Sequence, residues 1–487
     1  MIFTEPVFLI FFALTFGAYW FVRADWKFAL GPLRLSGYEL RLSILLLASA
    51  VFYGWWDWRF LGLIGLVIFI SWLAALRTAR LKPATPGRRA WLIFAIGANL
   101  AVLATFKYFG FFATSAAATM TAMGLTPSWP VLNILLPVGI SFYIFQAMSY
   151  IVDTARGDLA PEKRIRRVAL YIAFFPQLVA GPIVRAASFF PQMVRAKRLS
   201  GALVASGARA FIIGFAYKAG IADNLAPLVD PVFGNALAPG DADLSAWANS
   251  ALIGATLAFG AQIYFDFAGY SLMAIGVARL FGYHIPKNFD YPYAALSIAD
   301  FWRRWHISLS SWLRDYLYIP LGGNRGGEIK TYRNLMTTMV LGGLWHGAAW
   351  TFVAWGALHG AALVVHRALF GSSLRTIGSV FALILTQGFV LLTWAAFRAE
   401  SFSDMASVWY AFTGLRDGGA QMLPWFVWLV PGLLALDAVL GLKGRKLLEG
   451  LPMLRQPIVY WSGLGALAGV LLALYPLEAA PFVYFQF

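Results

Sequence analysis

Two histidines are the side chains in this sequence best suited to acid–base chemistry. His306 lies in the segment 301–316, which also holds three arginines and three tryptophans, and His346 lies in the apolar run 341–350. An ionisable group in an apolar run is costly and usually has a function. A positioned imidazole can take a proton from a hydroxyl, which contributes roughly 10²- to 10⁴-fold in rate. The alternative is that His346 only hydrogen-bonds a neighbouring helix, since the small residues around it suit close helix packing.

Three arginines of the same segment could bind an anionic ligand. Arg303, Arg304 and Arg314 carry planar guanidinium groups, which match the phosphate and carboxylate groups of a cytosolic molecule. Together with Trp305 they are our candidates for substrate binding. The alternative is interfacial anchoring, in which the arginines contact lipid headgroups and the tryptophans form an aromatic belt.

Four further ionisable residues lie in or near apolar runs. We expect Asp266 to pair with an arginine of the 301–314 region or to line a polar channel as part of the substrate site. His359 and His366 could share a helical face, but no third ligand lies close in sequence, and we predict no metal site. His284, which precedes Ile285 and a proline, is expected in a loop.

The composition indicates a membrane protein. Of the 487 residues, 60% are hydrophobic and only 12% are charged, whereas soluble domains carry about 25% charged residues. The net charge of +16 comes from short basic clusters between apolar runs, a pattern typical of cytoplasmic loops, so we predict no nucleic-acid partner. The chain has no cysteine, which excludes disulfides, thiolate metal sites and a cysteine nucleophile.

The apolar runs predict an all-α, polytopic membrane protein in contact with lipid. A transmembrane helix needs about 20 mainly apolar residues. We expect spans at 2–22, 42–56, 60–76, 91–113, 131–152, 247–281, 335–369, 376–397, 424–442 and 457–475.

The charges between the spans predict their orientation. The stretches 77–90, 153–167 and 443–455 are basic and are expected in the cytoplasm. The stretch 114–130 has no lysine or arginine, and 223–246 carries only acidic charges, so both are expected outside. This arrangement places the N- and C-termini outside.

Two segments do not fit a simple series of spans. Residues 168–190 are apolar but are flanked by basic residues and interrupted by prolines, which favours a re-entrant hairpin. Residues 283–334 are too charged for a span and too apolar for a free loop, so we expect a folded re-entrant region. Irregular backbone at membrane depth is tolerated where it is buried or lines a wet cavity, which implies such a cavity. We predict one domain over 1–487, with its core at about 130–370.

Six short motifs follow one another along the chain: Leu136–Tyr143, Phe175–Pro182, Tyr264–Tyr270, Asn288–Tyr293, residues 301–325 and Leu344–Gly347. Taken together, they resemble the membrane-bound O-acyltransferase (MBOAT) superfamily. The likeness is to its bacterial alginate O-acetyltransferase (AlgI) branch. One departure is Leu272, where an acidic residue would be expected, and it puts in doubt any polar contact there.

This resemblance implies an MBOAT-type helical barrel with a central tunnel, and the family's two signature polar positions fall on His346 and His306. It implies a multi-pass enzyme of the bacterial inner membrane, with periplasmic termini. The enzyme would move an acetyl group from acetyl-CoA or another cytosolic acyl thioester to a hydroxyl, for O-acetylation of an exported polysaccharide such as alginate. His346 would be the general base, and His306 would orient the donor or stabilise the oxyanion. No bound cofactor is expected.

The resemblance also implies partners and leaves alternatives open. The expected partners are a periplasmic acetyltransferase-type protein and the exopolysaccharide machinery. A D-alanyl-transferring relative would share the fold but take its donor from a carrier protein. A polysaccharide or acyl transporter without chemistry would also need broken helices and a cavity, but it should tolerate loss of His346.

Overall fold

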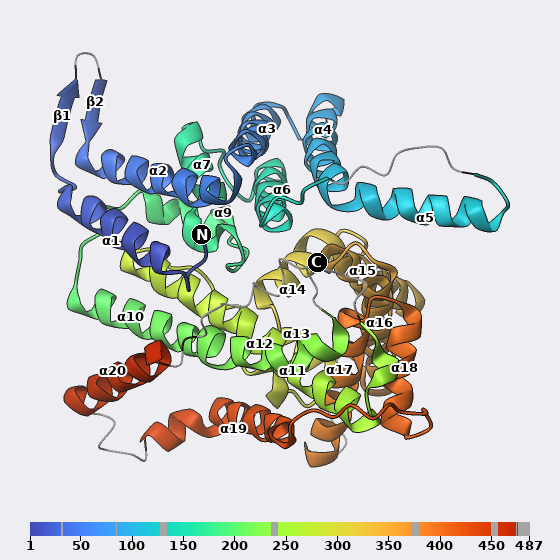
Figure 1. The fold of residues 1–487 in the computed structure, drawn as a ribbon. Coiled ribbons are helices and arrows are strands. Elements are labelled where there is room, and N and C mark those ends of the chain that lie inside the picture. Colours follow the sequence, from blue (N-terminus) through green and yellow to red (C-terminus); the bar gives the residue numbers. More distant parts are fainter. Residues whose placement is uncertain are drawn as a thin grey trace. The chain divides into compact units, whose positions relative to one another are not determined.

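The computed structural model describes residues 1–30, 33–83, 85–126, 134–234, 242–371, 379–449, 456–473 and 475. Most of these residues are helical, and among them the strands form one short β-hairpin (Figure 1). Among them, six helices are long and apolar enough to cross a membrane, which confirms the prediction of an all-α, multi-pass protein. The six are Phe60–Arg80, Pro86–Ala122, Gly201–Phe233, Asn249–Leu280, Trp350–Phe370 and Val380–Arg398.

The chain forms two compact units, and the first comprises residues 1–211 and 273–286. Its helix α4 continues through a π-helical turn, η1, into α5, and Figure 1 shows α5 running at an angle to α4. Its elements are α1 (Pro6–Phe21), β1 (Lys27–Leu30), β2 (Leu33–Ser36), α2 (Gly37–Asp57), α3 (Phe60–Arg80), α4 (Pro86–Leu103), η1 (Ala104–Tyr108), α5 (Phe109–Ala122), α6 (Ile140–Arg156), α7 (Ile165–Ala173), α8 (Phe175–Leu178), α9 (Ala186–Phe189), η2 (Phe190–Met193) and most of α10 (Gly201–Phe215).

Two of the family-like motifs meet inside this first unit. Gly139 begins α6 with a positive φ of 73°, and a side chain there would lie 2.5 Å from the backbone oxygen of Leu178. Only glycine allows this approach without strain. The segment 168–190 is broken into α7, α8 and α9, as its prolines predict, and it is largely buried. Its re-entrant character stays a prediction.

The second unit comprises residues 212–272 and 287–487 and holds both candidate histidines. Its elements are η3 (Ala216–Ala222), α11 (Asp223–Phe233), η4 (Leu244–Ala246), the first part of α12 (Asn249–Leu280), η5 (Pro292–Ala294), α13 (Ile298–Arg304), α14 (Ile307–Leu313), η6 (Arg314–Tyr318), α15 (Glu328–His346), α16 (Trp350–Phe370), α17 (Ser379–Arg398), α18 (Phe402–Thr413), η7 (Trp425–Leu429), α19 (Val430–Glu449) and α20 (Pro457–Ala473). The prediction of one domain over 1–487 concerns how the two units associate, and it stays a prediction.

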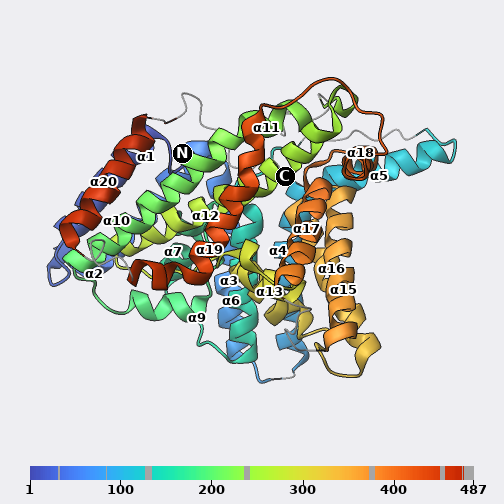
Figure 2. The ribbon, with the colours of Figure 1, turned by 90° about the horizontal axis from the view of Figure 1, so that it is seen from below.

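The predicted single span 335–369 is wrong, because the structure has two helices there. Helix α15 ends at His346, and α16 begins at Trp350 after an extended Gly347 and Ala349. Figure 2 shows α15 and α16 running side by side, with α17 next to α16. Small residues allow the close contact, since a side chain on Gly343 would lie 2.2 Å from the oxygen of Phe352. The break places His346 at a helix end instead of inside a span.

The predicted spans also lack one helical run that is long and apolar enough to cross a membrane. Helices α10, η3 and α11 form the apolar helical run Gly201–Phe233. Charged residues within it hid the run from a hydropathy reading, but Lys218 and Asp223 form an ion pair with a 2.6 Å separation. The stretch 153–167 is predicted inside and 223–246 outside, so the chain must cross the membrane once between them, and this run is long enough to do so.

Candidate active site

His346 is the last residue of α15, and aromatic rings enclose it. Its ring centroid lies 5.1 Å from those of Trp345 and Trp355 and 5.5 Å from that of Phe397. Trp355 comes from α16 and Phe397 from α17, so three helices define the position of the imidazole. Only 2% of His346 is exposed. A substrate therefore reaches this imidazole only when neighbouring side chains move, and the predicted central tunnel stays a prediction.

His306 lies beside His346, although forty residues separate the two in sequence. The ring centroids are 6.2 Å apart, and His306 is fully buried against Phe267 of α12, with centroids 4.7 Å apart. His306 connects α13 and α14 in a left-handed conformation with φ of 43°. Such a backbone is strained for a histidine and is held by its surroundings, a feature that clusters at functional sites. The structure thus brings together the two histidines that the sequence singled out.

A buried asparagine determines the tautomer of His306. Asn288 Oδ1 accepts hydrogen bonds from the backbone N–H and the hydroxyl of Ser308, at 3.2 Å and 2.9 Å. A backbone N–H can only donate, which identifies this atom of the amide as the oxygen. The same oxygen lies 3.0 Å from His306 Nδ1, so Nδ1 must carry a hydrogen. A neutral His306 therefore presents its lone pair on Nε2.

The surroundings also keep His306 uncharged. Burial lowers its pKa to about 3 from an ordinary 6.5, because the imidazolium loses its hydration. His306 is therefore neutral at physiological pH. Sequence reasoning missed Asn288 as a site residue. The available signal was its place at the start of the family-like motif Asn288–Tyr293.

The three arginines proposed to bind an anion, Arg303, Arg304 and Arg314, differ in their ion pairs within the protein and in their exposure. Arg304 forms an ion pair with Asp300, with Nε 3.0 Å from Oδ2, and also donates to the backbone oxygen of Asp290. Arg314 is exposed and pairs with its neighbour Asp315 at 2.8 Å. Arg303 is exposed on α13. Arg303 is therefore the one of the three best able to meet a ligand.

Trp305 is a core residue of the second unit. It is fully buried and stacks on Phe301, with centroids 5.5 Å apart and planes at 16°. Its ring also contacts Trp394 of α17 at 5.0 Å. These contacts hold Trp305 in the core and thereby position the backbone of the next residue, His306. The proposed contact of Trp305 with substrate stays a prediction.

Asp266 pairs with a lysine outside the 301–314 region, and its expected pairing with an arginine of that region stays a prediction. Asp266 Oδ1 lies 2.7 Å from Lys218 Nζ, and Lys218 also pairs with Asp223. All three side chains are at most 2% exposed. The reason is proximity, since the π-helical turn η3 carries Lys218 against α12. Buried charges are stable only when paired, so this cluster joins two apolar helices.

His359 has a structural role in hydrogen bonding. Trp302 donates its indole N–H to His359 Nδ1 at 3.3 Å, which leaves the hydrogen on Nε2 for Thr393 Oγ at 3.0 Å. Both ring nitrogens are thus used within the protein. In the described part of the chain, no group of three or more histidine, aspartate or glutamate side chains is arranged to hold a metal ion.

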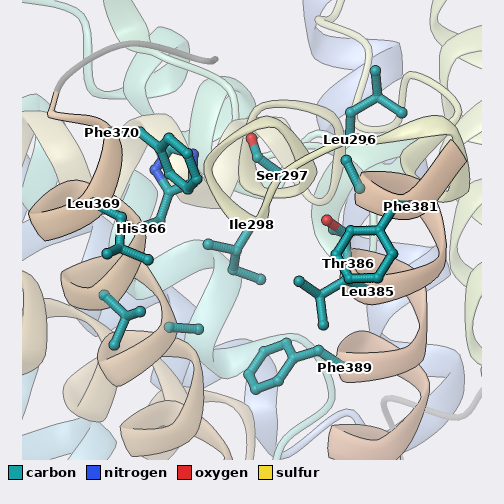
Figure 3. Close-up of a pocket in the computed structure, with 13 residues that line it drawn as sticks. Leu296, Ser297, Ile298, His366, Leu369, Phe370, Phe381, Leu385, Thr386 and Phe389 are labelled. Atoms are coloured by element: carbon teal, nitrogen blue, oxygen red, sulfur yellow. The ribbon is translucent and has the colours of Figure 1, made fainter. Parts of the chain in front are cut away.

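A separate apolar cavity of about 240 Å³ lies in the same unit. Figure 3 shows it between α16, α17 and the segment before α13, with His366 on one wall and Phe389 on another. Ser297, which caps α13 by accepting from the Asp300 N–H, also lines it. Neither His306 nor His346 belongs to its lining.

The chain belongs to the membrane-bound O-acyltransferase family, whose model matches residues 164–376. This match contains both histidines and the helices α15 and α16, whereas α17 follows it.

Three curated relatives show which kinds of acyltransferase the chain is similar to. A probable alginate O-acetylase AlgI of Azotobacter vinelandii is 43% identical over 84% of this chain and 77% of its own length. A peptidoglycan O-acetyltransferase of Helicobacter pylori is 37% identical over 76% of this chain and 73% of its own length. A teichoic acid D-alanyltransferase of Streptococcus thermophilus is 32% identical over 47% of this chain and 57% of its own. The chain is thus a multi-pass membrane O-acyltransferase, and its extended similarity is to O-acetyltransferases, as the motifs predicted.

Proposed function

We propose that this protein moves an acetyl group from a cytosolic acyl thioester, such as acetyl-CoA, across the membrane to a hydroxyl acceptor. The observation that carries the proposal is the buried pair His306 and His346, with ring centroids 6.2 Å apart, inside the region that matches the family model. A buried imidazole can accept one proton and give it up again within the same transfer, which is the chemistry that acyl transfer to a hydroxyl requires.

In the proposed reaction, His346 acts as general base. It takes the proton of the acceptor hydroxyl while the hydroxyl oxygen attacks the thioester carbonyl carbon. The new C–O bond forms, the C–S bond breaks, and the proton passes from His346 to the leaving thiolate. The chain has no cysteine, so transfer does not proceed through a thioester on the protein.

His306 is proposed to orient the donor. The sequence left two roles open, donor orientation and stabilisation of the oxyanion. The Nδ1–H tautomer supports the first, because a neutral His306 offers an acceptor at Nε2 and no hydrogen for an oxyanion. Acyl thioesters of coenzyme A carry amide N–H groups that such an acceptor can hold. Arg303 is proposed to meet the donor's phosphate groups.

The acceptor is proposed to be an exported polysaccharide such as alginate, or a periplasmic acetyltransferase-type partner that passes the group on. The alginate O-acetylases among the relatives support this assignment. The D-alanyl alternative has less support, since that relative matches about half of the chain. We further propose the bacterial inner membrane as the location, with both termini on the periplasmic side.

Inside-out membrane vesicles test the donor and the direction. Acetyl-CoA is added to the exposed cytoplasmic face, and release of free thiol is followed with a thiol reagent, to which the cysteine-free chain contributes no background. We expect thiol release that depends on acceptor in the vesicle lumen, and a fall of roughly 10²- to 10⁴-fold in His346→Gln.

The matched control is His284→Gln, since His284 is an exposed histidine of the first unit. It should keep full activity. Equal thiol release from the His346→Gln and control vesicles would reject the proposed base. If acetyl-CoA does not support thiol release and an acylated carrier protein does, the proposed donor is rejected.

A further inference from the structure

The first unit contains a basic cavity that the proposed reaction does not use. It measures about 580 Å³ and lies between the end of α1, the first part of α2 and the residues that precede α10. Its charged lining consists of four cations and one acid: Arg23, Arg41, Lys197, Arg198 and Asp25. Arg23 and Asp25 pair with each other at 3.1 Å, which leaves a net positive lining.

Arg41 is the unusual member of this lining, because it is a buried cation whose described contacts are with uncharged groups. It is 5% exposed, and its guanidinium donates to the backbone oxygens of Val22 and Lys197 at 2.6 Å and 2.9 Å. It also lies 5.1 Å and 4.9 Å from the ring centroids of Tyr19 and Trp20. These contacts fix the guanidinium in place but do not neutralise it.

Among the described residues, the two acids closest to Arg41 in sequence or in the cavity lining form ion pairs with other arginines. Glu39, two positions away, forms ion pairs with Arg164, Arg166 and Arg167. Asp25 is paired with Arg23, as above. Burying a cation without a counter-charge is unfavourable, because the ion loses its hydration and gains no opposite charge in return. An anion in the cavity would remove that cost.

We propose that this cavity binds the phosphate group of an anionic phospholipid. Its position favours a lipid over a soluble anion. Arg23 follows the apolar helix α1 by two residues, and Arg198 precedes α10, the start of an apolar span, by three. Charged residues just beyond the ends of apolar helices lie at the level of lipid headgroups. Trp20, with its indole N–H donating to Leu280, adds the aromatic side chain typical of that level.

Native mass spectrometry of the purified full-length protein in detergent tests this site. The probes are phosphatidylglycerol, phosphatidylcholine and inorganic phosphate, each titrated alone and in competition. We expect phosphatidylglycerol to be retained in preference to phosphatidylcholine, and millimolar phosphate to leave it bound. The double variant Lys197→Gln/Arg198→Gln should bind phosphatidylglycerol roughly 10- to 30-fold more weakly, as expected for two lost cations at a lipid surface.

The matched control is Lys82→Gln/Arg89→Gln, which removes the same charge from exposed positions of the same unit outside the cavity. It should bind phosphatidylglycerol like the unmodified protein. Because both variants change exposed side chains or a half-buried one, folding can be checked for each by its elution profile. Equal retention in the two variants would overturn the site, and displacement of the lipid by inorganic phosphate would overturn its assignment to a lipid.

Discussion

At the scale of residues, the site depends on how Asn288 holds His306. The asparagine oxygen accepts from Nδ1–H of His306 and from Ser308, while its amide donates to Ser271 Oγ at 3.2 Å. This satisfied network offsets the left-handed backbone of His306, a conformation that costs on the order of 1–3 kcal/mol. Asn288 is therefore a positioning residue that acts through His306.

Replacing Asn288 should separate positioning from folding. We predict that Asn288→Ala lowers kcat by about 10²-fold, since His306 would lose the acceptor that fixes its tautomer and orientation. Asn288→Asp retains the acceptor and should restore much of the rate. The measurement is kcat and KM for the acyl donor across a pH series.

The pH series provides a readout that a purely structural role would not change. In the unmodified protein the pKa of His306 is about 3, so His306 stays neutral and gives no acid limb near neutral pH. A carboxylate at position 288 favours the imidazolium and raises the pKa of His306. As the pH is lowered, the activity of Asn288→Asp should therefore begin to fall at a higher pH than that of the unmodified protein. Identical profiles for the two proteins, or full activity in Asn288→Ala, would contradict the positioning role.

At the scale of elements, the structure explains why some features were predictable and others were not. The long apolar runs and the broken segment 168–190 follow from composition and prolines, so sequence alone predicted them. The break after His346 was missed because Gly347 and two alanines do not lower hydropathy. The apolar run 201–233 was missed because its charges lower the hydropathy, and their pairing, within the run to Asp223 and across the fold to Asp266, is visible only in the structure.

The candidate site shows the same division. His306 and His346 carry a residue-type signal, since imidazoles are rare in apolar surroundings. Their proximity depends on the α15–α16 hairpin and the turn at His306, which no local pattern specifies. Trp305 was expected at a lipid or substrate surface, but tryptophan fits a packed core equally well, and here it is fully buried.

The hairpin that positions His346 should depend on its glycines. A methyl group on Gly343 would lie 2.2 Å from Phe352 O and 3.0 Å from Gly356 Cα, so α15 and α16 would have to separate. We predict that Gly343→Ala lowers the free energy of unfolding by about 1–3 kcal/mol and reduces activity. Thermal unfolding of the detergent-purified protein measures the first effect.

A matched glycine on α17 provides the control. A methyl group on Gly388 would meet no heavy atom within 4 Å, so Gly388→Ala should leave the melting temperature unchanged or slightly raised. If Gly343→Ala proves as stable and active as Gly388→Ala, the close packing of α15 on α16 is not what positions His346.

At the scale of the whole molecule, charge asymmetry sets the proposed orientation in the membrane. Residues 77–90 are rich in arginine, whereas 114–130 carries no lysine or arginine, and the apolar run Pro86–Ala122 joins them. Because positive charge is retained on the cytoplasmic side, we predict that Arg89 lies inside and Thr126 outside.

The cysteine-free sequence allows a direct test of this orientation. Single cysteines at two exposed positions, Arg89→Cys and Thr126→Cys, are exposed to a membrane-impermeant maleimide in spheroplasts. We predict labelling of the cysteine at 126 in intact spheroplasts and of the cysteine at 89 only after lysis. The reverse pattern would invert the topology and with it the proposed direction of acetyl transfer.

The most direct test of the central claim is the ester content of the exported polymer. A strain whose own copy is deleted is complemented with the unmodified protein, with His346→Gln or with His284→Gln, and membrane levels of each are matched by immunoblot. We predict acetylated polymer with the unmodified protein and the His284→Gln control, and polymer without acetyl esters with His346→Gln. Normal acetylation in the His346→Gln strain would contradict the role of His346 as the base.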